Sequence, residues 1–231
     1  MLPVSMPLSA LERRVIGCLP DIDPDRVGEV LGVGAQSLVR SYDAGGRSQV
    51  IKLPLFHVRR GMYAQTMGRV LGQRLEGAKA ELDTCAAYFG PYMVPTRIVS
   101  DPRTGFFCVL QDRIPLDEVT LSVLARAPGL NDQLGGIMEA NRRMIAERGQ
   151  WLDAMGWRLL KFTRFLTQGT PYLENVALDT HAQALRLFDF GLFPMPYRTP
   201  RSLRNYYRLL LGIQQRNMRG FGHAFAPVLS P

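Results

Sequence analysis

Apolar and polar residues alternate with a period of two in several segments of the first half of the chain, a pattern typical of half-buried β-strands. The segments are 27–34, 37–43, 49–54, 92–101 and 105–114. The first two flank a glycine-containing turn, and Gly45-Gly46 leads into the third. A hairpin followed by a further strand, and then a second pair of strands, are therefore expected.

Helical spacing of apolar residues opens the chain and dominates its second half. Ser9-Ala-Leu-Glu12 matches a capping box at the start of a short helix that Pro20 ends. The other predicted helices cover 63–89, 116–127, 131–167 and 200–218, and two short strands are expected within 170–179 and 184–193. The pattern predicts an α+β protein of two lobes, a strand-rich lobe over 1–113 and a helical lobe over 114–231.

The composition is that of a globular protein with a full core. The chain has 231 residues, of which 46% are hydrophobic, and no apolar run is long enough to span a bilayer. Charged residues at positions 12–14 interrupt the apolar stretch that a signal peptide needs, so a cytoplasmic location is expected. Cys18, Cys85 and Cys108 lack metal-ligand spacing and are interpreted as small buried hydrophobes.

Positive charge gathers at the C-terminal end. The net charge is +8, and from Leu192 onward there is no Asp or Glu. The arginines of this part are Arg198, Arg201, Arg204, Arg208, Arg216 and Arg219. The pattern fits either a solvated cationic helix face or a site for an anionic partner. Nucleic acid is one such partner, and a steep salt dependence of binding would identify it.

A glycine-rich segment precedes a lysine on the next strand. Gly32-x-Gly34-x-x-Ser37-x-Val39 lies in the first predicted hairpin, and Lys52 follows thirteen residues after Val39. Backbone amides of such a hairpin approach phosphate oxygens closely, and the lysine adds a point charge on the same phosphates.

Glu81 lies in the helical stretch 78–89, from which its carboxylate can reach toward a neighbouring strand. A Lys52–Glu81 ion pair would hold the lysine in its phosphate-binding orientation. Glu76 points to another side of the helix and is the weaker candidate.

Asn175 and Asp189 flank the last predicted hairpin, fourteen residues apart. Both side chains offer hard oxygen ligands, and Mg²⁺ bound to nucleotide phosphates takes few protein ligands. Asp189 is also expensive to bury between Phe188 and Phe190 without a partner. The pair is therefore a candidate magnesium site.

The glycine hairpin, Lys52, Glu81, Asn175 and the triplet Asp189-Phe-Gly191 together resemble the protein-kinase-like superfamily in order and spacing. The resemblance implies a two-lobed protein-kinase-like fold with a truncated helical C-lobe and MgATP bound between the lobes. It assigns the phosphates to Lys52 and magnesium to Asn175 and Asp189. The hinge would be Gln111 to Arg113, and Val39 and Ile51 would pack on the adenine ring.

The chain departs from the superfamily pattern in three ways. Ser37 replaces the third loop glycine, and only 40 residues follow Gly191. The His-Arg-Asp triplet would fall at Gln168-Gly169-Thr170, and threonine cannot act as a general base at neutral pH. In length and pattern the chain is similar to small bacterial kinase-like proteins such as the YrbL-like family.

Several functions remain open at the level of sequence. The first is an ATP- and magnesium-dependent kinase acting on an unknown protein or small-molecule acceptor. The second is a pseudokinase that works as a regulatory interaction module, with or without bound nucleotide. The third is AMP transfer, because the selenoprotein-O-like branch places an acidic residue where Glu174 precedes Asn175.

Overall fold

The computed structural model describes residues 7–34, 37–58, 75–156, 159–189, 191–223 and 225. The chain forms two compact units. Unit 1 comprises Met1–Leu82 and Val94–Arg113, and unit 2 comprises Asp83–Met93 and Ile114–Pro231. The α+β organisation predicted from the sequence is confirmed, with the strand-rich part first and the helical part second.

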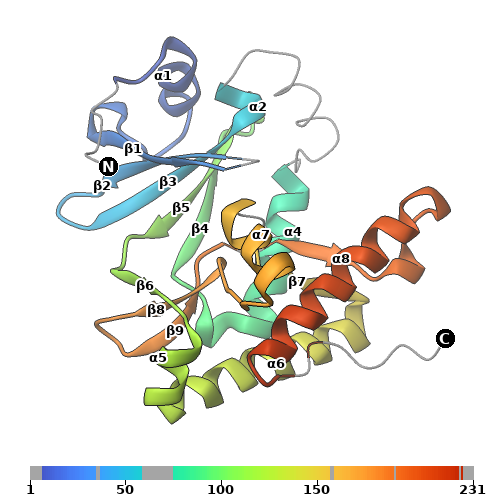
Figure 1. Ribbon diagram of the computed structural model, residues 1–231. Coiled ribbons are helices and arrows are strands. Elements are labelled where there is room, and N and C mark those ends of the chain that lie inside the picture. Colours follow the sequence, from blue (N-terminus) through green and yellow to red (C-terminus); the bar gives the residue numbers. More distant parts are fainter. Residues whose placement is uncertain are drawn as a thin grey trace. The chain divides into compact units, whose positions relative to one another are not determined.

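Unit 1 is built on a five-stranded antiparallel sheet (Figure 1). Its strands are β1 (Val27–Val33), β2 (Ser37–Asp43), β3 (Ser48–Pro54), β4 (Thr96–Ser100) and β5 (Phe107–Asp112), and their order is β1-β2-β3-β5-β4. All five strands expected in this part of the sequence are present. Gly45 and Gly46 make the turn before β3 with left-handed backbones, which glycine adopts without steric cost.

One face of this sheet is covered by α1 (Ala10–Gly17) and the short α2 (Leu55–Val58), and a 3₁₀ turn, Pro24–Arg26, leads into β1 (Figure 1). The capping box is confirmed, because the Ser9 hydroxyl accepts the Glu12 N–H and the Glu12 carboxylate accepts the Ser9 N–H. The same carboxylate accepts Arg40 Nε at 2.6 Å in a buried ion pair. Helix α1 is thereby tied to strand β2.

Helix α4 (Leu75–Phe89) is the described part of the helix predicted over 63–89; residues 63–74 lie outside the described residues. Its last residues and the 3₁₀ turn Gly90–Tyr92 belong to unit 2, whose core includes Cys85, Tyr88 and Phe89. The buried cysteines at 85 and 108 match the prediction, whereas Cys18, at the end of α1, is only partly buried.

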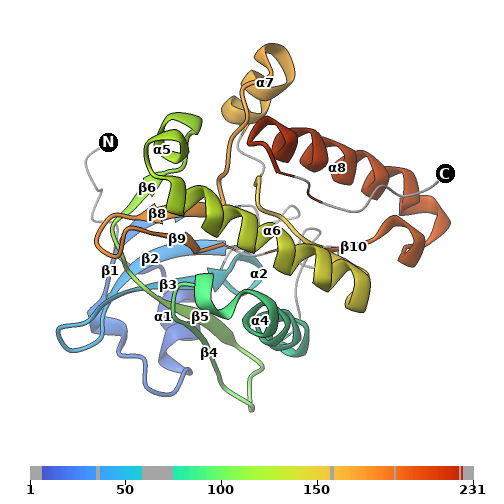
Figure 2. The same cartoon turned by 90° about the horizontal axis from the view of Figure 1, so that it is seen from below.

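The helices and strands of unit 2 enclose a second core that holds Leu134, Met144, Trp151 and Leu210 (Figure 2). The helices are α5 (Leu121–Arg126), α6 (Pro128–Arg148), α7 (Leu159–Gln168) and α8 (Arg201–Gly220), with a 3₁₀ turn at Pro196–Arg198. Strands β6 (Leu116–Glu118), β8 (Val176–Asp179) and β9 (Ala184–Leu187) form one small sheet. Strands β7 (Gln150–Leu152) and β10 (Leu192–Pro194) form another.

Two helix predictions in unit 2 are wrong in their extent. The segment 116–127 begins as strand β6 because it pairs with β8, and α5 starts only after its cap Thr120. The long helix expected over 131–167 ends at Gly149, whose backbone is left-handed, and β7 follows. The buried Asn141 side-chain oxygen accepts a hydrogen bond from the Leu152 N–H, and this bond holds β7 beside α6. No helix within the described residues is long and apolar enough to cross a membrane.

Candidate functional site

The glycine hairpin of unit 1 connects β1 and β2 as predicted. Gly32 lies opposite Val39, and the Gly34 N–H donates to the Ser37 carbonyl at 2.8 Å. The tip, residues 35 and 36, lies outside the described residues.

Gly32 is not required by the backbone of the hairpin. Its φ is not in the left-handed region, and a Cβ added to it would meet no atom within 4 Å. A larger residue would therefore fit. The absence of a side chain leaves the backbone open for close approach by a ligand, which is the use of glycine that phosphate-binding loops make.

Lys52 lies on the face of the sheet opposite to α1. It pairs with Val39 on β2 and with Val109 on β5, and residues directly opposite each other in a sheet project from the same face. All three side chains are half-buried. Their neighbours Ile51 and Leu110 project from the other face and are buried in the core beneath α1 and α2.

The expectation that Ile51 packs on an adenine ring beside Lys52 is therefore wrong. Consecutive strand residues point to opposite faces, and Ile51 is fully buried on the far one. Val50, two residues before Lys52, lies on the lysine face and pairs with Gln111. The Gln111 side chain is buried and donates to the Thr96 hydroxyl at 3.0 Å.

Glu81 is half-buried in the middle of α4. The alternative, Glu76, is exposed and pairs with Lys79 at 3.3 Å. The Lys52–Glu81 ion pair remains a prediction.

In unit 2 the hairpin of β8 and β9 brings the predicted metal ligands into one region. Asn175 precedes β8 and Asp189 follows β9 by two residues, while Val176 pairs with Leu187. The Phe188 N–H donates to the Asn175 carbonyl at 3.3 Å. Asp189 itself is exposed, so the cost of burying it, inferred from its aromatic neighbours, does not arise.

A further carboxylate, Asp153, lies in the same region and was missed in the sequence analysis. It follows β7 directly, and its N–H donates to the Gly191 carbonyl at 2.8 Å. Its carbonyl accepts the Asn175 side-chain amide at 2.7 Å. Backbone hydrogen bonds thus connect Asp153 with both the asparagine and the segment that carries Asp189.

The loop after Asp153 is fixed by a glycine. The Asp153 carboxylate accepts the Gly156 N–H at 2.9 Å, and Gly156 has a left-handed backbone with φ of 66°. A Cβ on Gly156 would lie 2.7 Å from Glu174 Cβ and 3.1 Å from Asn175 Oδ1. Gly156 is therefore needed both for the turn and for the space beside Asn175.

The Tyr172 hydroxyl contacts this loop and donates a hydrogen bond to the Gly156 carbonyl at 3.2 Å. Burial, together with the carboxylates of Asp153 and Glu174, raises the pKa of Tyr172 above its usual value. The phenol stays protonated at neutral pH and serves as a hydrogen-bond donor.

The assignment of Thr170 to the position of the catalytic aspartate, which the resemblance implies, remains a prediction. Thr170 is exposed in the loop after α7, and α7 lies between Asp153 and Asn175 in the chain. The available sequence signal for Asp153 was its charge within the apolar run Trp151–Met155.

Glu174, the candidate for AMP transfer, pairs with Lys161 of α7 at 2.8 Å. Lys161 also pairs with Glu118 of β6 at 3.1 Å. The Glu174 carboxylate thus helps to hold α7 against the rest of unit 2.

The histidines do not form a reactive group. His57 packs against Phe106 and Phe107, and burial lowers its pKa to about 4. His223 contacts Asn131 Oδ1 through Nε2 at 3.0 Å, and His181 is exposed. Among the described residues no three His, Cys, Asp or Glu side chains gather as a metal site.

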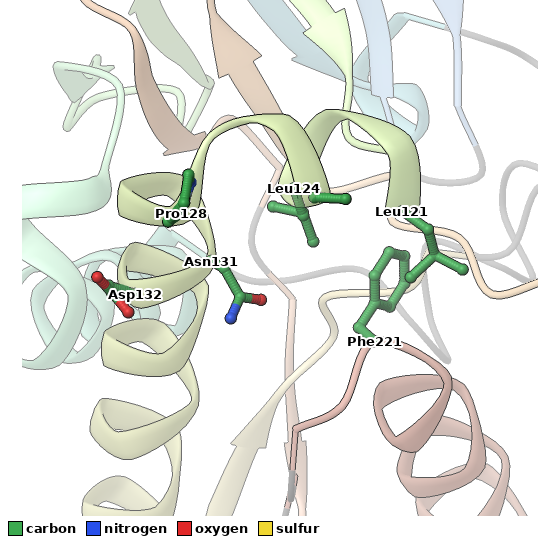
Figure 3. A pocket seen from close by; sticks show the side chains of 7 residues that line it. Leu121, Leu124, Pro128, Asn131, Asp132 and Phe221 are labelled. Carbon is green, nitrogen blue, oxygen red and sulfur yellow. The ribbon is translucent and has the colours of Figure 1, made fainter.

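A hollow of about 360 Å³ in unit 2 lies at α5, the start of α6 and the end of α8 (Figure 3). It is lined by Leu121, Leu124, Ala125, Pro128, Asn131, Asp132 and Phe221. None of the predicted site residues lines it, so this hollow is separate from the Asp153 region.

Comparison with known proteins gives likenesses in structure but none in sequence. No family model matches the chain, and no curated protein sequence matches it. The crystal structure of the Mycobacterium tuberculosis PknI kinase domain superposes with a TM-score of 0.41 and 16% sequence identity, covering 87% of this chain and 77% of that one. Superposition at this level does not carry a function from one chain to the other, and the chemistry must be inferred from the residues themselves.

Proposed function

We propose that this protein is a kinase-like phosphotransferase that binds magnesium and ATP and transfers the γ-phosphoryl group to an acceptor. The observation that carries the proposal is the arrangement in unit 2. There, Asp153, Asn175 and the segment of Asp189 are joined by the hydrogen bonds Asn175 Nδ2 to Asp153 O and Asp153 N to Gly191 O.

Asn175 and Asp189 are the proposed magnesium ligands. The Asn175 amide nitrogen donates a hydrogen bond to the Asp153 carbonyl. The amide oxygen Oδ1 is therefore the proposed ligand atom. Oδ1 lies beside Gly156, where Glu174 Cβ and Cγ leave no room for a further side-chain atom. The exposed carboxylate of Asp189 supplies the second hard oxygen. Bound Mg²⁺ would neutralise charge on the phosphates during transfer.

Unit 1 supplies the proposed nucleotide contacts. The open backbone at Gly32 and Gly34, and the charge of Lys52, suit the phosphates. Val39 and Val50 lie on the Lys52 face of the sheet and suit an apolar base.

Asp153 is the proposed general base for the acceptor hydroxyl. The residue is 5% exposed, and its carboxylate accepts the Gly156 N–H. A carboxylate held in this way can accept a proton during transfer, a contribution typically worth ~10²–10⁴-fold in rate.

The low exposure of Asp153 also supports the second candidate, a pseudokinase that binds nucleotide as a regulatory module. A carboxylate engaged within its own loop serves the fold even when no acceptor reaches it. AMP transfer ranks last, because it needs a reactive Glu174 and this carboxylate pairs with Lys161.

The test is calorimetric titration of MgATP into the full chain, with metal-free ATP and two variants as controls. We expect metal-dependent binding that is lost in Asp189→Asn and retained in Asp117→Asn, a matched change at another exposed aspartate of unit 2. Unchanged MgATP affinity in Asp189→Asn would remove the metal assignment. Lys52→Met should weaken binding with or without metal, because its charge acts on the phosphates directly.

A further inference from the structure

Helix α8 has one side packed in unit 2 and one side uncovered. Its buried residues, Leu210, Leu211, Gln214, Asn217 and Met218, recur every three or four positions and form a single face. Leu210, Leu211 and Met218 belong to the core of unit 2.

The uncovered side is basic. Arg201, Arg208 and Arg219 are exposed and are separated by seven and eleven residues, about two and three helical turns, so they lie in one line. The helix contains no acidic residue, and none of the described carboxylates pairs with these three arginines. Their charge is therefore directed at solvent or at a partner.

Two exposed apolar side chains lie to one side of this line of arginines. Leu209 and Tyr206 are 62% and 54% exposed, and at 3.6 residues per turn they lie about 80° and about 140° round the helix from Arg201. Leu203, which is 47% exposed, lies on the opposite side of the helix from Arg201. Arg216, seven residues after Leu209, lies on the same side as Leu209 and stacks over Phe165 of α7 at 5.5 Å. Arg201, Arg208, Leu209 and Tyr206 thus lie on one side of the N-terminal half of α8, which we call the α8 surface.

The combination selects the kind of partner. A nucleic acid would use the arginines but gain little from an exposed Leu209, and a solvated helix gains nothing from exposing Leu209 and Tyr206 beside its arginines. A membrane interface uses both, because arginines bind anionic headgroups while leucine and tyrosine enter the boundary with the acyl chains. We propose that the α8 surface docks unit 2 on anionic lipid bilayers.

The test measures sedimentation of the full chain with vesicles of phosphatidylcholine alone and of phosphatidylcholine with phosphatidylserine, at an ionic strength of about 0.1 M. We expect binding only to the anionic vesicles. Arg201→Glu/Arg208→Glu should lower the partition coefficient at least about tenfold. The charge-matched control is Arg14→Glu/Arg103→Glu, two exposed arginines of unit 1, which should change it much less.

A second pair of variants distinguishes binding to lipid from binding to other anionic partners. Leu209→Ser should reduce vesicle binding severalfold, whereas Leu31→Ser, at an exposed leucine of β1, should not. These side chains are exposed, and unchanged thermal melts confirm that the variants fold. Equal losses in the α8 and control variants would overturn the proposal. Binding of a single-stranded oligonucleotide that Leu209→Ser leaves intact, without vesicle binding, would also overturn it and identify a nucleic-acid surface.

Discussion

The candidate site residues of the two units are positioned in different ways. In unit 1, Gly32, Val39 and Lys52 lie on three adjacent strands, and the pairing of these strands places them on one face. In unit 2, Asp153, Asn175 and Asp189 come from three separate loops that are joined by hydrogen bonds between distant segments. The alternation of apolar and polar residues along the chain identifies the strands that carry the unit 1 residues. The unit 2 residues come together only in the tertiary structure.

The largest effect is expected for a substitution of Asp153, one of the three site residues of unit 2. Asp153→Asn keeps an oxygen that can accept the Gly156 N–H but removes the base, so γ-phosphate transfer or ATP hydrolysis should fall by ~10²–10⁴-fold. MgATP affinity should change little. Steady-state kinetics and calorimetry on the same variant separate the two effects.

Thr170→Ala is the matched control, because Thr170 was the position assigned to the base by sequence spacing. Its side chain is exposed, and we expect activity and stability to be unchanged. A loss of activity in Thr170→Ala with full activity in Asp153→Asn would reverse the assignment.

A second comparison tests the two faces of β3. Ile51→Ala should lower the free energy of unfolding by about 2–5 kcal/mol, because Ile51 is fully buried under α1 and α2. Val50→Ala should cost less stability, since Val50 is only half-buried, but should weaken ATP binding. Urea denaturation and calorimetry give both quantities. If Ile51→Ala alone affected ATP affinity, the face assigned to the nucleotide would be wrong.

Alanine substitutions at two glycines, one in each unit, test the comparison between the two sites further. Gly156→Ala should destabilise unit 2 by at least about 1 kcal/mol, because its φ is 66° and the new Cβ would clash with Glu174. Gly32→Ala should leave stability within about 0.5 kcal/mol, since no atom is near. It should instead reduce ATP affinity about tenfold, equivalent to about 1.4 kcal/mol. Unchanged affinity in Gly32→Ala would mean that the open backbone serves no ligand.

The smallest effect is a pH dependence confined to unit 1. Burial alone would raise the pKa of Glu12, but hydrogen bonds from Arg40 and Ser9 outweigh it and hold this pKa below 4.5. The contribution of Glu12 to stability is thus fully present above pH 4.5 and is lost as the pH falls through the lowered pKa. Glu12→Gln should flatten this acid limb in thermal melts. An acid limb identical to that of the wild type would exclude Glu12 as its cause.

The incorrect expectations have different origins. The contact of Ile51 with the adenine ring was implied by the family resemblance, although alternation along β3 places Ile51 on the face opposite to its neighbour Lys52. The helix expected over 131–167 was drawn through Gly149 because the pairing of β7 with β10, which ends it, joins residues about 40 positions apart. Asp153 was missed because the inserted α7 lengthens the path to Asn175.

The sequence by itself determined the capping box of α1, the five strands of unit 1 with their turns, and the basic character of α8. These features depend on residues close together in the chain, so local pattern and turn chemistry suffice to predict them. Only the tertiary structure decided that Asp153 lies beside Asn175, that a side chain at Gly156 would clash with Glu174, and that α8 exposes Tyr206 and Leu209 beside its arginines. Burial and contacts between distant segments determine these properties, and periodicity along the chain does not encode them.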